Sequence, residues 1–447
     1  MNLRKKIIFN ALFVLFGALA LHAPARSHAE TTPPNISTEI NFLTYQDAVK
    51  IALHDNVDLL ALRNQEEAFK YQSKQAVAPN EPTFTINKND IPGFSLTQTP
   101  ATTIYTISWT LGFPGKAFSN SASIRHQSEA VSEQARTQEI TIMTSLSNTY
   151  VSFTTNKALS SFLLDEQEKD KELVKLIEKK FSASQASKVD LLNAEVATQQ
   201  IAQAILENRN DYDVLLTQFR QIIRRPADKA LAPRIPDVIV IPTVTQTLDE
   251  LVPVMLKNNH AVAAAGRTVD SQSSLRTSAS LQAFPDLQLS AGINKWIPPA
   301  APNQGLTRDY SIGLGIAVPL FFPLNELQGI HAAGKNLEAA ENQLASQQLQ
   351  AISNLQTAYT SLQATLRDLD MSEKLVVPAA KASFDLTLMT YGLGKADYFI
   401  LNASRKAWHD SERDMLTKRQ NAAQFYNQLI TQMGCDIAKS EGPNVCK

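Results

Sequence analysis

The stretch TTIYTISWTLGFPGK, residues 102–116, decides the fold of this chain. Between residues 104 and 111 the side chains alternate strictly between an apolar face and a face of mostly small, polar residues. The apolar face carries Tyr105, Ile107, Trp109 and Leu111. Alternation with a period of two predicts a β-strand with two different faces. The apolar face could line a soluble core or contact lipid.

A long helical pattern follows the break at Phe113-Pro114-Gly115. Residues 117–181 contain neither proline nor glycine, and their apolar side chains recur at spacings of three and four. A continuous helix of about 65 residues would be about 95 Å long, which exceeds an ordinary globular domain. The pattern stops in a run of small residues at 181–187 and resumes over 189–223. Two long helices joined by a tight turn predict an antiparallel hairpin.

The chain then repeats itself. Residues 44–56, where Thr44 can cap a first helix that runs to about residue 77, overlay residues 247–259. The return after each long helix also matches, Leu-Leu-Asn-Ala at 191–194 and Ile-Leu-Asn-Ala at 400–403. A repeat of this length decides a fold more reliably than local propensity does.

The second copy contains the same predicted elements. Strands are expected at 286–296 and 310–318, as a short strand is at 83–87 in the first copy. The last strand again has an apolar face, made of Tyr310, Ile312, Leu314 and Ile316. A second long helix is predicted over 325–391 with a heptad seam, and Pro378 should kink it.

These boundaries divide the chain into five segments. We predict a signal peptide at 1–29, a first repeat at 30–226, a connector at 227–246, a second repeat at 247–434 and a C-terminal tail at 435–447. The signal is indicated by basic residues at 4–6, an apolar run at 7–21 and small residues at 27 and 29. A retained N-terminal anchor is the alternative. No later apolar stretch has the length of a transmembrane helix.

Composition narrows the class of protein. The net charge of −1 over 447 residues leaves no electrostatic footprint for nucleic acid. Only 15 glycines are present, which favours long helices over many short turns. Cys435 and Cys446 could close a small loop in an oxidising compartment, or remain two unpaired thiols.

Motifs for catalysis are absent from the sequence. It contains no HExxH, CxxC, GxSxG or phosphate-binding glycine loop. The histidines, including His126, His260 and His409, show no ligand spacing and are expected on the surface or in packing contacts. We therefore expect no enzyme activity, no cofactor and no metal site.

The four predicted strands cannot close a barrel alone, and open edges in a membrane would leave backbone groups unsatisfied. Three chains would together form a 12-stranded β-barrel with a water-filled lumen, and their long helices would together form a tunnel. The expected fold is therefore mainly α with a membrane β-barrel, built from a duplicated helix-strand-strand-long helix-turn-helix unit. A soluble coiled-coil protein with two packed β-hairpins is the alternative.

Residues 43–433 resemble the TolC-like outer-membrane efflux proteins. The resemblance rests on the twofold repeat, the paired strands and two turn signatures: Phe181 and Ser184 before Asp190 in the first copy, and Tyr391 and Gly394 before Leu401 in the second. It implies a homotrimer in the outer membrane, with the helical tunnel in the periplasm. Such proteins are passive exit ducts for an inner-membrane pump and a periplasmic adaptor protein.

The resemblance also implies that the helical turns form the periplasmic tip and gate. The residues at these turns are Lys180, Phe181, Ser184, Lys188, Asp190, Tyr391, Gly394, Lys395 and Asp397. The family's closed tip involves a tyrosine of the second turn and an aspartate of the first, which match Tyr391 and Asp190. A hydrogen bond between them would make a plausible latch. Ordinary packing and capping roles are the alternative.

The chain departs from the family pattern in several places. Ser184 stands where glycine is usual, and the acidic ring of some members has no counterpart at Phe399, Ile400 or Asn402; Asp397 could substitute. The Pro-Gly-Lys ending at Lys116 is similar to the heavy-metal-efflux branch. Metal, drug-like or other small-molecule cargo therefore stays open, as does a role in type I protein secretion.

Overall fold

The computed structural model describes residues 41–89, 102–228, 230–296, 307–318 and 320–435. The predicted signal peptide lies outside these residues, and so does Cys446, whereas Cys435 is described and buried. Among the described helices, none combines the length and the apolar character needed to cross a membrane.

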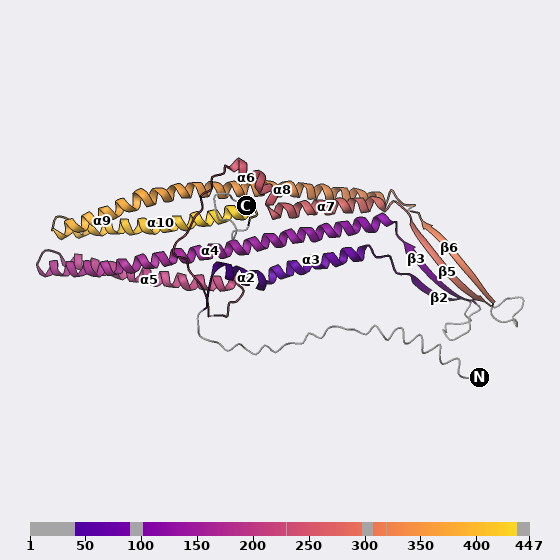
Figure 1. Cartoon of the computed structure of the whole chain (residues 1–447), viewed down its shortest axis with the longest axis horizontal. Helices are drawn as coiled ribbons and strands as arrows, with labels where there is room; N and C mark the ends of the chain where they lie inside the picture. Colours follow the sequence, from indigo (N-terminus) through magenta and orange to yellow (C-terminus); the bar gives the residue numbers. More distant parts are fainter. Residues whose placement is uncertain (1–40, 90–101, 229, 297–306, 319, 436–447) are drawn as a thin grey trace, which may run out of the picture. The chain divides into compact units, whose positions relative to one another are not determined.

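The elements of the first repeat follow the predicted order (Figure 1). They are β1 (Asn41–Leu43), α2 (Tyr45–Asp55), α3 (Val57–Ala76), β2 (Thr83–Asn89), β3 (Thr102–Leu111), α4 (Pro114–Ser182) and α5 (Lys188–Ile222). Thr44 caps α2 as predicted, by accepting a hydrogen bond from the Asp47 amide. The predicted single first helix is two helices, because the Asn56 side chain accepts from the Leu59 amide and starts α3 as a new helix.

The second repeat has the same order, except that its long helix is divided into α8, η1 and α9. Its elements are α6 (Leu248–Asn258), α7 (His260–Leu281), β5 (Asp286–Trp296), β6 (Thr307–Ala317), α8 (Glu326–Met371), η1 (Ser372–Val376), α9 (Val377–Gly392) and α10 (Tyr398–Gln432). Asn259 caps α7 as Asn56 caps α3. The connector, expected to be irregular, contains β4 (Leu231–Pro233), which pairs in parallel with β1.

Pro378 interrupts the long helix of the second repeat as predicted. It lies in the first turn of α9, directly after the five-residue π-helix η1 that joins α9 to α8. A proline inside a helix removes a backbone donor and clashes with the preceding turn, so the local widening relieves the strain. The predicted heptad seam of α8 also packs as expected, with Leu355 and Leu362 fully buried.

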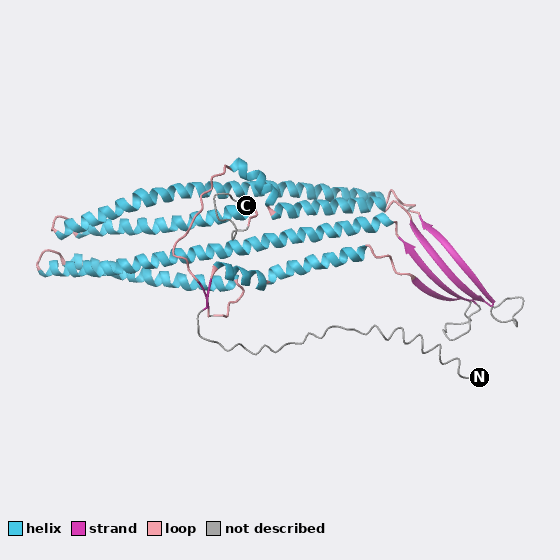
Figure 2. Ribbon diagram, viewed as in Figure 1, coloured by secondary structure: helices cyan, strands magenta, loops and turns pink. Residues whose placement is uncertain are grey.

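The four longer strands form one antiparallel sheet in the order β2-β3-β5-β6, apart from the pair β1 and β4 (Figure 2). The two repeats meet at the centre of the sheet, where β3 pairs with β5. Strands β2 and β6 are its edges. A duplicated unit therefore builds a single sheet in which each repeat supplies two neighbouring strands.

Helix α4 organises the helical part. It packs against α3, α5, α7 and α10, while α8 packs against α7 and α10. Its 69 residues span about 100 Å at the helical rise. Helices α4 and α5 form one hairpin, and α9 and α10 form the other (Figure 1). Each hairpin turn therefore lies far along its helix from the sheet.

The turns correct the predicted alignment of the two return helices. Ser187 caps α5, and Asp397 caps α10 at the equivalent position. Counting from these caps, Leu191 corresponds to Leu401, and both are buried. The sequence match of 191–194 with 400–403 was therefore out of register by one residue, because identical letters outweighed the burial pattern.

Candidate functional site

The sheet has one continuous apolar face. Directly paired residues of antiparallel strands point to the same face, so the strand register defines rows of neighbouring side chains. Four such rows cross β3, β5 and β6: Tyr105, Ile293 and Tyr310; Ile107, Ala291 and Ile312; Trp109, Leu289 and Leu314; Leu111, Leu287 and Ile316. Phe84 and Ile86 extend two of these rows onto β2. The two predicted apolar strand faces are thus parts of one surface.

This apolar face is open to its surroundings in the single chain. Ile312 is 93% exposed and Tyr310 is 76% exposed, although both are large apolar or aromatic side chains. Soluble proteins rarely leave a contiguous apolar surface of this kind uncovered. The opposite face carries small and polar residues, with Thr106, Gly292 and Ser311 in one row. The face therefore requires a cover that the described part of the chain does not supply.

The segment Phe113–Lys116, at the break between β3 and α4, contacts the second repeat. Lys116 Nζ lies 2.7 Å from Asp286 Oδ1, and the Phe113 amide donates to the same oxygen at 3.0 Å. The Phe113 ring also stacks on Phe284, with 4.8 Å between ring centroids. Asp286 begins β5, so one carboxylate of the second repeat fixes the strand-to-helix junction of the first.

The two hairpin turns have the same backbone conformation. Ser184 and Gly394 both adopt the left-handed region, with φ of 60° and 72°. Glycine reaches this region without strain, and serine reaches it at some cost. Ser184 therefore occupies the position that favours glycine, and the departure noted in the sequence changes the residue but not the turn.

Both aspartates of the turns act as helix caps. Asp190 accepts from the Ser187 amide at 3.0 Å, while the Ser187 hydroxyl accepts from the Asp190 amide at 3.0 Å, which makes a capping box. Asp397 accepts from the Ile400 amide at 2.9 Å. The carboxylates thus face the positive ends of α5 and α10, where negative charge is stabilising.

The expected bond between Tyr391 and Asp190 is not made within the described residues. The hydroxyl oxygen of Tyr391 is buried there without a hydrogen-bond partner, and burial followed by the Asp190 charge raises the pKa of Tyr391. Its ring packs edge-on against Tyr398 at 6.4 Å. The latch between these two residues stays a prediction, and the chain itself shows the packing and capping roles.

Lys180 makes the direct contact between the two turns. Its ammonium donates to the Gly392 carbonyl at 3.1 Å and lies 5.2 Å from the centre of the Tyr391 ring. Lys188 lies 5.6 Å from the Phe181 ring within the first hairpin. Lys395 is exposed.

Charged residues lie within the buried seam of α4, a feature that the sequence analysis missed. The seam follows spacings of three and four through Leu163, Glu166, Asp170, Leu173, Ile177 and Lys180, all of them buried. Arg405 of α10 pairs with Asp170, and His409 Nε2 lies 2.5 Å from Glu166 Oε2. Carboxylates at heptad core positions were the available signal, and they specify which helix can pack there.

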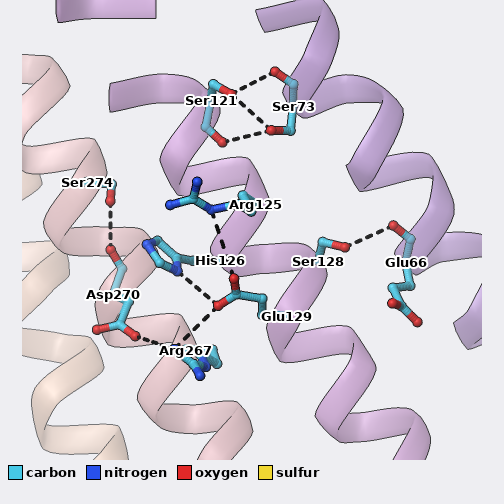
Figure 3. A network of polar contacts seen from close by, with 10 residues as sticks. All are labelled: Glu66, Ser73, Ser121, Arg125, His126, Ser128, Glu129, Arg267, Asp270 and Ser274. Carbon is cyan, nitrogen blue, oxygen red and sulfur yellow. Dashed lines mark hydrogen bonds and ion pairs between the residues drawn. The ribbon is translucent and has the colours of Figure 1, made fainter. Parts of the chain in front are cut away.

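Polar contacts also fix the part of α4 nearer the sheet (Figure 3). The hydroxyls of Ser73 and Ser121 lie 2.9 Å apart between α3 and α4, and the Ser128 hydroxyl donates to the Glu66 carbonyl at 3.0 Å. Figure 3 also shows Glu129 of α4 facing Arg267 of α7 at 3.4 Å. Small hydroxyl side chains let the helices approach closely while satisfying their polar atoms.

No cluster of three or more metal-ligating side chains is present in the described ranges. His126 contacts Glu129 at 3.2 Å and His260 contacts Glu133 at 2.7 Å. The ring of each of these histidines therefore contacts a glutamate carboxylate, in line with the packing role expected for it.

Several solved channel and outer-membrane proteins have the same fold as this chain. The outer-membrane channel OprN is 17% identical, with a TM-score of 0.73 over 88% of this chain and 90% of that chain. CusC is 12% identical, with a TM-score of 0.74 over 91% and 96%. The outer membrane protein VceC from Vibrio cholerae is 16% identical, with a TM-score of 0.73 over 90% and 97%.

The sequence itself carries the family assignment. No curated protein matches the chain. The profile of the family described as outer membrane efflux protein matches residues 48–223 and 251–435, one match for each repeat. These two segments cover most of the chain, and the chain therefore belongs to the outer membrane efflux protein family.

Proposed function

We propose that three copies of this chain assemble into a passive exit duct, with a β-barrel in the outer membrane and a helical tunnel in the periplasm. The observation that carries the proposal is the sheet of four strands with one exposed apolar face. Its edges, β2 and β6, carry backbone groups that need partners in a membrane. Pairing β6 of one copy with β2 of the next satisfies them and closes a 12-stranded barrel.

Aromatic rings on the apolar face support lipid as its cover. Tyr105 of β3 and Tyr310 of β6 lie in one row of this face, and Trp109 lies on the same face nearer the helical end of β3. Trp296 pairs with Thr102 and lies on the opposite face, so it takes no part in this surface. Tyrosine and tryptophan rings settle at boundaries between membrane and water.

The helical turns supply the end that faces the export machinery. Family membership makes the protein an efflux component of the outer membrane, and the resemblance implies a periplasmic adaptor that contacts the tip and an inner-membrane pump that supplies energy. We propose residues 180–190 and 391–397 as this tip. Within the proposal, the chain conducts cargo without chemistry of its own.

Detergent extraction and planar-bilayer recording test the duct. The protein should sediment with the outer membrane, elute in detergent as a trimer and form discrete conductance steps in a lipid bilayer. A soluble periplasmic monomer that forms no pore would contradict the proposal and favour the coiled-coil scaffold.

Deleting the gene tests which cargo the protein exports. The sensitivity of the deletion strain to metal ions, drugs and solvents is measured alongside its protein secretion. Selective metal sensitivity would support the heavy-metal branch suggested by the Pro114–Lys116 motif. Loss of a secreted protein with unchanged sensitivities would instead favour the type I secretion role.

A further inference from the structure

Lys180 occupies the last core position of the charged α4 seam. The side chain is only 9% exposed, and it follows Leu173 and Ile177 at spacings of seven and three residues. An ammonium at such a position loses much of its hydration, which is costly unless protein groups replace the water. Its contacts therefore show what this lysine holds together.

Among the described residues, the contacts that replace this water come from the other hairpin. The Gly392 carbonyl, which accepts from Lys180 Nζ at 3.1 Å, belongs to the last residue of α9. Carbonyls at a helix C-terminus have no partner within the helix and carry the negative end of its dipole. The face of the Tyr391 ring, 5.2 Å away, adds an electrostatic attraction of the cation–π type.

No carboxylate forms an ion pair with Lys180 anywhere in the described part of the chain. The acidic groups of the turns, Asp190 and Asp397, are engaged as helix caps. The contact with Gly392 and Tyr391 is therefore the main compensation for burying this charge. It differs from the expected Tyr391–Asp190 bond because it uses the tyrosine ring rather than its hydroxyl group.

We propose that Lys180 is a positioning residue that ties the turn of the first hairpin to the turn of the second and so limits how far the two turns separate. The proposal rests on the function proposed above, since the turns are taken as the periplasmic end of the duct. Loss of the ammonium frees the α9 end from α4. The tip then samples open arrangements more often.

The test compares Lys180→Met with Lys179→Met in purified full-length trimers. Methionine keeps the apolar stem of Lys180 but removes its charge, and Lys179 is the neighbouring lysine on the exposed side of the same turn. We expect Lys180→Met to raise the open population of single channels about tenfold, as for loss of a charged hydrogen bond. Lys179→Met should match the wild type, and Lys180→Arg should retain closure.

Hydrogen exchange on the same trimers tests the contact of Lys180 with the second turn without relying on conductance. The amides of residues 182–187 and 391–397 should exchange faster in Lys180→Met and at the wild-type rate in Lys179→Met. Unchanged amide exchange and unchanged conductance in Lys180→Met would overturn the proposal that Lys180 holds the two turns together. A wild-type protein that forms no pore would instead contradict the proposed function. The exchange rates would then still show whether Lys180 holds the two turns together.

Two substitutions at Tyr391 separate the ring from the hydroxyl. Tyr391→Phe keeps the face that Lys180 contacts and should behave as the wild type, whereas Tyr391→Leu removes the ring and should open the tip as Lys180→Met does. If Tyr391→Phe alone raised conductance as much as Lys180→Met, the hydroxyl rather than the ring would hold the tip, and the assignment to Lys180 would fail.

Discussion

Single residues in the seam between α4 and α10 carry charges that the fold must accommodate. Arg405 and Asp170 are both buried, with side chains 9% and 4% exposed. Burying two charges is costly, and removing one partner leaves the other uncompensated. The pair therefore specifies how the two hairpins pack more than it adds net stability.

Asp170→Asn should lower the free energy of unfolding by about 3–5 kcal/mol, because it strands the Arg405 guanidinium inside the protein. The measurement is thermal unfolding of the purified protein. Asp410→Asn is the control, since Asp410 pairs with Lys406 on the exposed side of α10 and should change little. Equal losses of stability from the two substitutions would show that breaking the buried pair costs no more than breaking an exposed one.

Glu412 gives a pH dependence of opposite sign to that of an ordinary paired carboxylate. Burial, with a smaller contribution from Glu166, raises the pKa of Glu412 against the attraction of Lys381 and Arg419, and its Oε2 has no partner among the described residues. A raised folded-state pKa means that the folded chain binds the proton more tightly, so stability is lost as pH rises through that value.

Glu412→Gln should therefore stabilise the protein near pH 7.5, by less than about 1 kcal/mol because solvent screens part of the cost. The gain should vanish near pH 4, where both states are protonated. Melting curves at the two pH values check this, with the exposed Glu341→Gln as control. A gain that persisted at low pH would point to packing instead of charge.

At the scale of elements, the C-terminal end of α10 is held by a close backbone contact. Gly434 has a φ of 72°, and a Cβ atom there would fall against the carbonyl of Asn258, where α6 ends. The neighbouring cap Asn259 donates to the Gln432 carbonyl at 2.8 Å. Helix α10 is thus fixed against the joint of α6 and α7, which needs a residue without a side chain at 434.

Gly434→Ala should destabilise the protein by about 2 kcal/mol or more, because left-handed strain and a clash with backbone act together. Gly334→Ala, in the helical interior of α8 with open space around it, should be neutral or slightly stabilising. Thermal melts of both variants make the comparison. A tolerated Gly434→Ala would mean that α10 shifts away from Asn258.

At the scale of the whole molecule, the two sheet faces should respond differently to charge. Ile312 lies on the apolar face and its neighbour Ser311 on the small, polar face. Ile312→Lys should cost about 2–4 kcal/mol in a membrane and reduce assembly in the outer membrane. Ser311→Lys should assemble and alter conductance. Western blots of outer-membrane fractions, with bilayer recordings of each variant, distinguish the faces, and equal loss of both would argue against a wet lumen.

The sequence alone determined the repeat, the order of its elements and the two faces of the strands. The elements and the strand faces follow from local periodicities of about 3.6 and 2 residues, and the repeat follows from the match between the two copies. Thr44, Pro378 and the seam around Leu355 behave as their local chemistry predicts. Such features depend on residues at most one or two helical turns apart.

Only the tertiary structure decided which residues meet across the repeats. The pairing of β3 with β5, the contact of Asp286 with Lys116 and the burial of Asp170 against Arg405 join residues far apart in the chain. No local period encodes such contacts. The same holds for Lys180, which the family resemblance predicts at the tip. Its partner, the Gly392 carbonyl, is a backbone atom that only the packing of the two hairpins brings within reach.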